Sequence, residues 1–212
     1  MNPLLRLERA RLYLVLEARP HGEDPSALLD AALRGGVDVV QLRDKDLPDD
    51  ELVRAAEPFR RACDAHGALF VLNDRPDLVD ACAADGVHVG QVDTSVREAR
   101  AVVGTDRIVG LSIETEAQLD AIAGADYLGV GAVFATPTKT DSVAGGLELV
   151  RATAARVSVP WFAIGGIERA NVAEVVAAGA PGVAVVRAIR DADDPEAAAR
   201  SLRAALGEPP AA

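Results

Sequence analysis

Eight short runs rich in β-branched and apolar residues, alternating with segments of helical spacing, constrain the fold of this chain more than any other feature. The runs occupy residues 12–16, 37–43, 69–73, 87–89, 108–113, 127–133, 161–164 and 183–186. After the second run, Leu52, Ala56 and Phe59 recur with the helical period. Right-handed crossovers add parallel strands in one direction until a sheet closes, so the alternation predicts an α/β fold, a (β/α)8 TIM barrel.

An open, doubly wound sheet is the alternative to the barrel. Its dinucleotide-binding form carries G-x-G-x-x-G after the first strand, and no such sequence follows residues 12–16. Gly129 and Gly131 lie in the sixth run without a third glycine at the required offset. These absences favour the closed barrel.

The length of the chain limits how many domains it can form. A chain of 212 residues, of which 50% are hydrophobic, can bury one substantial core, so we expect residues 1–212 to form a single barrel domain. Within it, residues 1–10 would add a helix that closes the barrel bottom, and residues 208–212 would form a frayed tail. Pro58 would kink or divide the second helical segment.

The charge balance restricts the partners of this chain. A formal net charge of -11 makes attraction to nucleic acid or to an anionic membrane unfavourable. No apolar run approaches the roughly 20 residues of a membrane span, and the N-terminus lacks the order of a signal peptide. Cys63 and Cys82 have no metal-binding spacing, so we expect two reduced, packed thiols. The sequence indicates a cytoplasmic protein; it does not fix the oligomeric state and is compatible with a homo-oligomer.

Polar residues gather where the predicted strands end, which is where barrel enzymes bind their ligands. In the second run, the period of two sends Gln41, Arg43 and Lys45 to one face and Leu42 to the other. Lys45 and Lys139 are the only two lysines, and both follow strand ends. A lysine ammonium is a compact charge suited to phosphate, so we expect an anion-binding mouth.

Two acids follow neighbouring strands. Asp74 comes directly after residues 69–73, and Asp93 follows the fourth run. Mg²⁺ prefers one or two carboxylates, with water and phosphate oxygens completing its octahedron, so this pair is a candidate metal site. Helix N-capping by each aspartate is the alternative, and three further acids compete for the metal: Asp44, Asp77 and Asp80.

A histidine and several phosphate-binding candidates complete the predicted mouth. We expect His88 to be a packed, hydrogen-bonded strand residue in preference to an acid or base. Barrels commonly bind phosphate through the backbone after strands seven and eight. The candidates for that role are Gly165, Gly166, Val186 and Arg187, with Thr136 and Thr138 after the sixth run.

Five segments carry a family resemblance. They are Gln41-x-Arg43-x-Lys45, Asn73-Asp74-Arg75-x-Asp77, His88-x-Gly90-Gln91-x-Asp93, Thr136-Pro137-Thr138-Lys139 and Ile164-Gly165-Gly166-Ile167. In this order on successive strand ends, they resemble the thiamine phosphate synthase family from about residue 12 to about residue 206. The resemblance implies a Mg²⁺-dependent transferase of thiamine biosynthesis. Such an enzyme couples 4-amino-5-hydroxymethyl-2-methylpyrimidine diphosphate with thiazole ethyl phosphate and releases diphosphate through a pyrimidine-methylene cation.

The resemblance also implies roles for individual residues. The pyrimidine diphosphate would be held by Gln41, Arg43, Lys45, Asn73, Ser112 and Lys139. The metal would be held by Asp74 and Asp93. The thiazole phosphate would be held by Thr136, Thr138, Gly166, Val186 and Arg187. No acid or base is implied; instead the departing diphosphate would be stabilised by Arg43, Lys45 and Lys139.

Three positions depart from the family pattern, and two rival functions use the same scaffold. Ala132 and Ala135 stand where proline is frequent, and Arg187 stands where serine is frequent. We expect the Arg187 guanidinium to add a bidentate phosphate contact. A related thiazole tautomerase moves a proton and therefore needs a base. A phosphate-sensing barrel without turnover is the non-enzymatic alternative.

Overall fold

The strands of the computed structural model pair in chain order from β1 to β8, and β8 pairs with β1, so the sheet is a closed barrel. Every pairing is parallel. The structure describes residues 2–135 and 145–207. The strands are β1 (Leu12–Leu16), β2 (Val39–Leu42), β3 (Leu69–Asn73), β4 (Gly86–Val89), β5 (Ile108–Ile113), β6 (Tyr127–Val130), β7 (Trp161–Ile164) and β8 (Val183–Val185). The predicted (β/α)8 barrel is confirmed.

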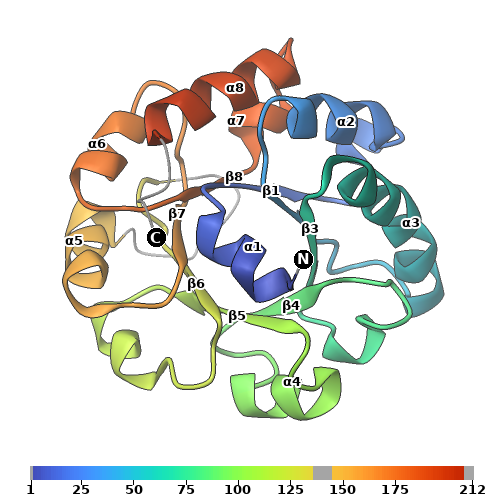
Figure 1. The fold of residues 1–212 in the computed structure, drawn as a ribbon, viewed down its shortest axis with the longest axis horizontal. Helices are drawn as coiled ribbons and strands as arrows, with labels where there is room; N and C mark the ends of the chain where they lie inside the picture. Colours follow the sequence, from blue (N-terminus) through green and yellow to red (C-terminus); the bar gives the residue numbers. More distant parts are fainter. Residues whose placement is uncertain (1, 136–144, 208–212) are drawn as a thin grey trace.

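Apart from α1, the helices form a ring outside the barrel (Figure 1). In chain order the α-helices are α1 (Pro3–Arg9), α2 (Ser26–Arg34), α3 (Asp49–His66), α4 (Val96–Val103), α5 (Gly146–Arg156), α6 (Val172–Ala177), α7 (Arg187–Arg190) and α8 (Pro195–Leu206). Short 3-10 turns supplement them: η1 (Pro20–Gly22), η2 (Pro76–Leu78) and η3 (Glu116–Ala121).

Two of the predicted strand-to-strand helices are 3-10 turns and not α-helices. The β3–β4 connection contains only η2, and the β5–β6 connection only η3; both connections lie wholly within the described residues. Ala83, with a φ of 50°, interrupts helical backbone shortly after η2, and Gly124, with a φ of 86°, does so after η3. These reversals leave too little chain for several α-helical turns.

Helix α3 is not divided at Pro58, contrary to one of the two expectations for that residue. It runs unbroken through 18 residues and ends at Gly67, whose φ of 70° is left-handed. Proline removes one intrahelical hydrogen bond. The buried face of Leu52, Ala56 and Phe59 packs in the core cluster between helices and sheet, and this packing outweighs that loss.

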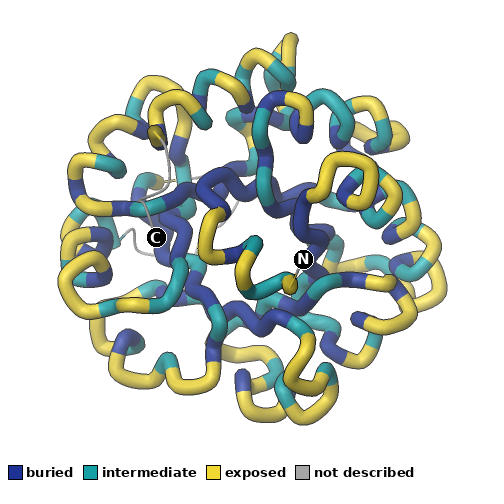
Figure 2. Tube along the Cα trace, viewed as in Figure 1, coloured by how far each residue is buried: buried dark blue, intermediate teal, exposed yellow. Residues whose placement is uncertain are grey.

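The hydrophobic core has two parts, and the strands contribute alternate side chains to each. The barrel strands are mostly buried along their length (Figure 2). The larger part lies between sheet and helices and includes Leu42. The smaller part fills the barrel interior and includes Tyr13, Tyr127 and Phe162. Leu7 of α1, which is 1% exposed, joins this inner part, and α1 lies across the barrel centre in Figure 1. The functional cavity therefore has to open at the other end.

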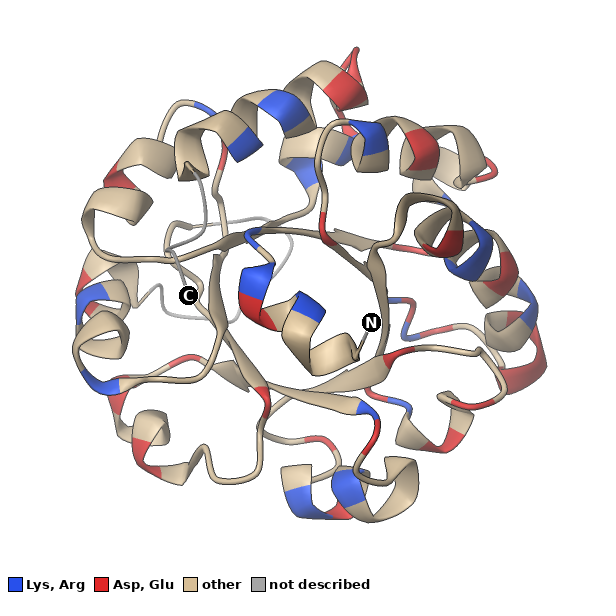
Figure 3. Ribbon diagram, in the orientation of Figure 1, with Lys and Arg blue, Asp and Glu red and all other residues tan. Residues whose placement is uncertain are grey.

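The outer surface carries most of the charge. Figure 3 shows acidic and basic residues over the outer helices and the connections, whereas the strands carry few. Among residues 2–135 and 145–207, no helix combines the length and apolar character needed to cross a membrane. Cys63 and Cys82 are buried and unbridged, as expected. The predicted tail, 208–212, lies outside the described residues.

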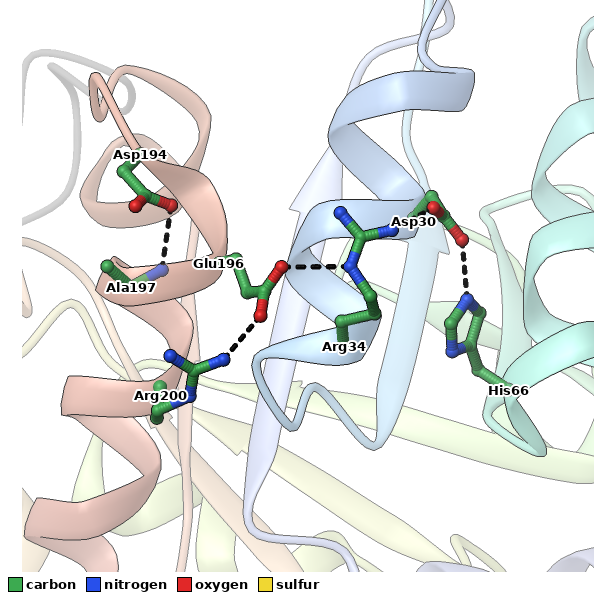
Figure 4. Close-up of polar contacts among 7 residues, drawn as sticks. All are labelled: Asp30, Arg34, His66, Asp194, Glu196, Ala197 and Arg200. Atoms are coloured by element: carbon green, nitrogen blue, oxygen red, sulfur yellow. Dashed lines mark hydrogen bonds and ion pairs between the residues drawn. The ribbon is translucent and has the colours of Figure 1, made fainter.

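Ion pairs tie the outer helices together (Figure 4). Glu196 of α8 lies between Arg34 of α2, at 2.8 Å, and Arg200 of its own helix. Asp30 contacts both Arg34 and His66, which extends the network to α3. These groups are largely exposed, so the network orients the helices while each pair contributes little stability.

Candidate active site

A cavity of about 480 Å³ opens where the carboxyl ends of the strands meet. This volume suits a small-molecule ligand. Each predicted site residue that the structure describes lines it: Gln41, Arg43, Lys45, Asn73, Asp74, Asp93, Ser112, Gly166, Val186 and Arg187. The predicted residues Thr136, Thr138 and Lys139 lie outside the described residues. Sequence positions from strands all around the barrel therefore share one cavity.

Along β2 and the turn after it, the polar side chains become more exposed from the barrel interior to the rim. Gln41 is 4% exposed, whereas the Lys45 side chain is 50% exposed, and Arg43 lies between them in sequence and in burial. Leu42 points to the helices and belongs to the outer core. The alternation predicted for this strand is thus present, with an uncharged amide deep inside and two cations nearer to solvent.

Lys45, Asp74 and Asp93 converge at the rim. The Lys45 ammonium nitrogen lies 2.8 Å from Asp74 Oδ2 and 4.0 Å from Asp93 Oδ1. The other oxygen of Asp93 accepts a hydrogen bond from the backbone N–H of Gly90 at 3.1 Å. A side chain at position 90 would collide with that oxygen, since a Cβ would come within 2.4 Å of it. Two carboxylates from successive strand ends are therefore held around one cationic group.

Asp74 has an unusual backbone conformation. Its φ of 60° lies in the left-handed region, which residues other than glycine, asparagine and aspartate seldom adopt. Its backbone N–H donates to the carbonyl oxygen of His88 at 2.8 Å, which continues the β3–β4 pairing beyond the strand. A non-glycine residue held in this conformation is typical of functional sites, where surrounding contacts overcome the local strain.

The competing acids serve other contacts. Asp77 accepts two hydrogen bonds from Arg75, and these hold the pKa of its carboxyl below the ordinary value. Asp80 pairs with Arg107 at 3.0 Å, and Asp44 accepts from the backbone N–H of Ala18 at 3.3 Å.

These three acids do not line the cavity, whereas Asp74 and Asp93 do. Within the described ranges, no group of three or more histidine, cysteine, aspartate or glutamate side chains is placed to hold a metal ion.

Glycines after β7 bring the backbone close to the opposite side of the cavity. Gly165 and Gly166 have φ values of 106° and 63°, so both need the freedom that glycine has. A Cβ at position 166 would lie 2.8 Å from that of Phe134. Val186 precedes helix α7, and Arg187 is exposed at its first turn. Gly165, Gly166, Val186 and Arg187 thus line one side of the cavity together.

Further charged residues of the cavity were not identified from the sequence. Arg190 pairs with Glu17 at 2.9 Å and with Asp191, and its hydrogen bonds hold the pKa of the Asp191 carboxyl below the ordinary value. Glu114 and Glu168 also line the cavity. Each follows a strand end, so the same positional signal that identified Asp74 would have found them.

His88 lies in a hydrogen-bonded position, as predicted. Its Nδ1 is 3.0 Å from the Tyr127 hydroxyl and its Nε2 is 2.9 Å from Ser112 Oγ. Sequence analysis missed the two tyrosines of the barrel interior, Tyr13 and Tyr127, whose hydroxyls are 2.9 Å apart. A signal for them existed: they are the only tyrosines of the chain, and both occupy inward-facing strand positions.

Comparisons with known proteins agree with one another. A family model described as thiamine monophosphate synthase matches residues 12–189. A thiamine-phosphate synthase of Thermobifida fusca is 50% identical over 205 residues, covering 95% of this chain and 94% of the relative. One from Streptomyces avermitilis is 48% identical over 201 residues, covering 93% and 94%.

Solved structures resemble the barrel as well. A thiamine phosphate pyrophosphorylase from Pyrococcus furiosus superimposes with a TM-score of 0.86 at 32% identity, covering 95% of this chain and 97% of that one. A 3-hexulose-6-phosphate synthase aligns with a TM-score of 0.66 at 21% identity, covering 93% of this chain and 100% of that one. The second likeness concerns the fold alone.

Proposed function

The chain belongs to the thiamine monophosphate synthase family, and on that premise we propose how its barrel mouth performs thiamine phosphate synthesis. The reaction joins a pyrimidine diphosphate to a thiazole phosphate and releases diphosphate. The observation that carries the proposal is the convergence of Lys45, Asp74 and Asp93 on one point of the rim.

Asp74 and Asp93 would hold Mg²⁺. Both carboxylates approach one ammonium group, so this position already attracts a cation, and the two side chains offer only hard oxygen donors. Mg²⁺ suits two carboxylates when water and phosphate oxygens supply the remaining ligands. When bound, it would neutralise charge on the diphosphate and so make it a better leaving group. The three acids that competed with this pair in the sequence, Asp44, Asp77 and Asp80, have other partners and do not line the cavity, which supports the pair.

The pyrimidine ring and the diphosphate of the first substrate would bind at different depths of the cavity. Its deep part presents uncharged polar groups, with Gln41 and Ser112 on inward positions and Asn73 at the end of β3. Its rim presents Arg43 and Lys45. An aminopyrimidine ring can hydrogen-bond to the uncharged polar groups, and a diphosphate needs the two cations. We therefore place the ring inside and the diphosphate at the rim.

Bond breaking would then be driven by charge stabilisation. The methylene–oxygen bond of the pyrimidine substrate breaks, and its electron pair leaves with the diphosphate, where Arg43 and Lys45 stabilise the growing negative charge. Lys139, outside the described residues, is assigned the same role from the sequence. The thiazole nitrogen lone pair then forms the new carbon–nitrogen bond to the methylene carbon. No proton has to be removed, so no catalytic base is required.

The thiazole phosphate would bind at the β7–β8 side. Gly166 and the backbone at Val186 offer close main-chain approach, and Arg187 adds a guanidinium that can grip two phosphate oxygens. The sequence adds Thr136 and Thr138 to this set. Binding here would place the thiazole ring beside the ring pocket of the pyrimidine, because both sites border one cavity.

The tautomerase alternative gains no support from His88, the histidine that lines the cavity. It requires a base to move a proton. Both ring nitrogens of His88 lie within hydrogen-bond distance of the Tyr127 and Ser112 hydroxyls, so this histidine is positioned by the barrel interior. The clamp of cations and carboxylates at the rim is suited to a departing diphosphate.

The test is a reconstituted reaction. The purified protein is mixed with the pyrimidine diphosphate, thiazole phosphate and Mg²⁺, and thiamine phosphate and free diphosphate are quantified. Equal amounts of both products should form, and chelation of Mg²⁺ with EDTA should stop their formation. Release of diphosphate without thiamine phosphate, or no reaction at any Mg²⁺ concentration, would contradict the proposed function.

A further inference from the structure

A continuous chain of hydrogen bonds crosses the barrel interior below the cavity. Gln41 Nε2 donates to the Tyr13 hydroxyl at 2.8 Å, and that hydroxyl lies 2.9 Å from the Tyr127 hydroxyl. The Tyr127 hydroxyl lies 3.0 Å from His88 Nδ1. His88 Nε2 lies 2.9 Å from Ser112 Oγ. This series of hydrogen bonds thus begins and ends at residues that line the cavity. It passes through residues from five different strands.

The interior is shaped to contain this chain. Gly110 lies on β5 between His88 on β4 and Tyr127 on β6, and a Cβ there would come within 2.2 Å of Tyr127 Cζ and 2.6 Å of His88 Nδ1. A Cβ on Gly129 would lie 3.1 Å from His88 Cε1. The ring of Phe162 packs edge-on against both tyrosine rings, at centroid distances of 5.2 and 5.9 Å. Two glycines therefore make room for the chain and one aromatic ring holds it.

The donor at one end fixes the direction of the hydrogen bonds. The Gln41 amide nitrogen can only donate, so the Tyr13 oxygen accepts from it and the Tyr13 hydrogen is left for Tyr127. Tyr127 then donates its own hydrogen to His88 Nδ1. Tyr13 and Tyr127 are 2% and 0% exposed, and burial raises the pKa of both phenols above the ordinary value, so each keeps its hydrogen.

The same order continues to the far end of the chain. A His88 ring that accepts at Nδ1 carries its hydrogen on Nε2 and donates it to Ser112 Oγ. Ser112 Oγ then accepts from His88, so its own hydroxyl hydrogen remains available to a ligand in the cavity that Ser112 lines. At the near end, one hydrogen of the Gln41 amide nitrogen is held by Tyr13, which orients the amide, and its carbonyl oxygen remains able to accept from a ligand in the cavity. One end therefore offers an acceptor and the other a donor.

We propose that Tyr13, Tyr127 and His88 are positioning residues that fix this polarity, so that the cavity selects a ring bearing an amino donor beside a ring-nitrogen acceptor. The inference rests on the proposed function, in which Gln41 and Ser112 contact the pyrimidine ring. A 4-aminopyrimidine has that pattern, whereas its 4-oxo counterpart presents a carbonyl acceptor and a ring N–H donor. The 4-oxo ring would leave like groups facing each other at both ends, and unpaired buried polar groups weaken binding strongly.

Tyr127→Phe is the first variant to test, because it removes one hydroxyl and keeps the ring that packs against Phe162. The Michaelis constant of the pyrimidine diphosphate should rise about ten-fold, the loss expected for one buried hydrogen bond. The preference for this substrate over the 4-oxo diphosphate, measured as an inhibitor, should fall by a similar factor. The Michaelis constant of the thiazole phosphate should change less than about two-fold.

Thr153→Val is the matched control. It also removes a fully buried hydroxyl, but Thr153 Oγ1 donates to the Leu149 carbonyl within helix α5, away from the barrel interior. Its effects on both Michaelis constants should be absent. If Tyr127→Phe behaves like Thr153→Val while the wild type makes thiamine phosphate, the inference is overturned and the proposed function stands. A wild type that makes no thiamine phosphate overturns both.

A second measurement needs no variant. Nitrogen-15 spectra of the histidine side chains of the wild type, at pH 8, report which ring nitrogen carries hydrogen, and only three histidines have to be assigned. His88 should show hydrogen on Nε2 and none on Nδ1. A ring with hydrogen on Nδ1 would reverse the order of the chain and overturn the inference, even if Tyr127→Phe fails to fold.

Discussion

Gly110→Ala tests whether the barrel interior is shaped around the tyrosine and histidine rings. The added methyl would lie 2.2 Å from Tyr127 Cζ and 2.3 Å from Cε1, far inside van der Waals contact. Tyr127 cannot yield easily, because it is fully buried and packs against Tyr13 and Phe162, each at a centroid distance of 5.9 Å. Overpacking of this kind costs about 1–3 kcal/mol of unfolding free energy.

Gly129→Ala provides the matched comparison. There the new methyl would lie 3.1 Å from His88 Cε1, and His88 is only partly buried beside the cavity, so a shift of a few tenths of an ångström relieves the contact. We expect a cost below about 1 kcal/mol for this change. Thermal unfolding should show a midpoint lower by roughly 2–12 °C for Gly110→Ala, at roughly 2–4 °C for each kcal/mol in a chain of this size, and little change for Gly129→Ala.

Equal stability of the two variants would refute the argument. A double variant provides the internal check: Tyr127→Leu vacates the space that the new methyl needs, so Gly110→Ala should cost much less in that background. The two changes should therefore be non-additive, as expected for residues in contact. Additive losses would mean that the methyl at position 110 meets something other than Tyr127. Urea unfolding of the wild type, the two single variants at positions 110 and 127 and the double variant gives the free energies of unfolding for this comparison.

Three further predictions concern other parts of the chain. Asp93→Ala should abolish Mg²⁺-dependent thiamine phosphate formation with the circular dichroism spectrum intact, whereas Asp80→Ala, outside the cavity, should leave the rate unchanged; activity of the Asp93 variant would remove that residue from the metal site. Burial raises the pKa of the Cys63 and Cys82 thiols to about 12 and about 11, so a disulfide reagent at pH 8 should label neither in the folded protein and both in urea; rapid labelling of the folded protein would contradict their burial. Asp194→Ala should lower the unfolding free energy by about 1 kcal/mol, because the carboxylate caps helix α8 by accepting from the Ala197 N–H at 2.9 Å (Figure 4), while Asp194→Asn should cost less; equal losses would exclude capping as the cause.

Much of the fold could be predicted because it follows from local periodicity. The eight apolar runs specify eight strands, and the period of two correctly separates Gln41, facing inward, from Leu42, facing the helices. Four of the predicted runs coincide with the observed strands; others, such as 37–43 and 127–133, extend beyond the residues that pair. Strand pairing ends when the backbone turns into a loop, and a run of apolar residues can continue through that turn.

The interior hydrogen-bond chain was beyond local pattern analysis for a different reason. Tyr13 and Tyr127 are 114 positions apart, and only closure of the sheet brings their hydroxyls together. In sequence, a tyrosine within an apolar run is indistinguishable from an ordinary core residue. The residue between His88 and Tyr127 across the sheet, Gly110, has a meaning only once the register of three strands is known.

The left-handed backbone at Asp74 affects how its carboxylate can be studied. Alanine at this position would remove the charge and also impose a conformational penalty, since a plain methyl side chain disfavours a φ near 60°. An inactive alanine variant could therefore result from either the lost charge or the altered backbone. Asparagine tolerates this region and keeps the shape of the side chain, and glycine relieves the backbone entirely, so comparing these two exchanges separates electrostatics from main-chain geometry.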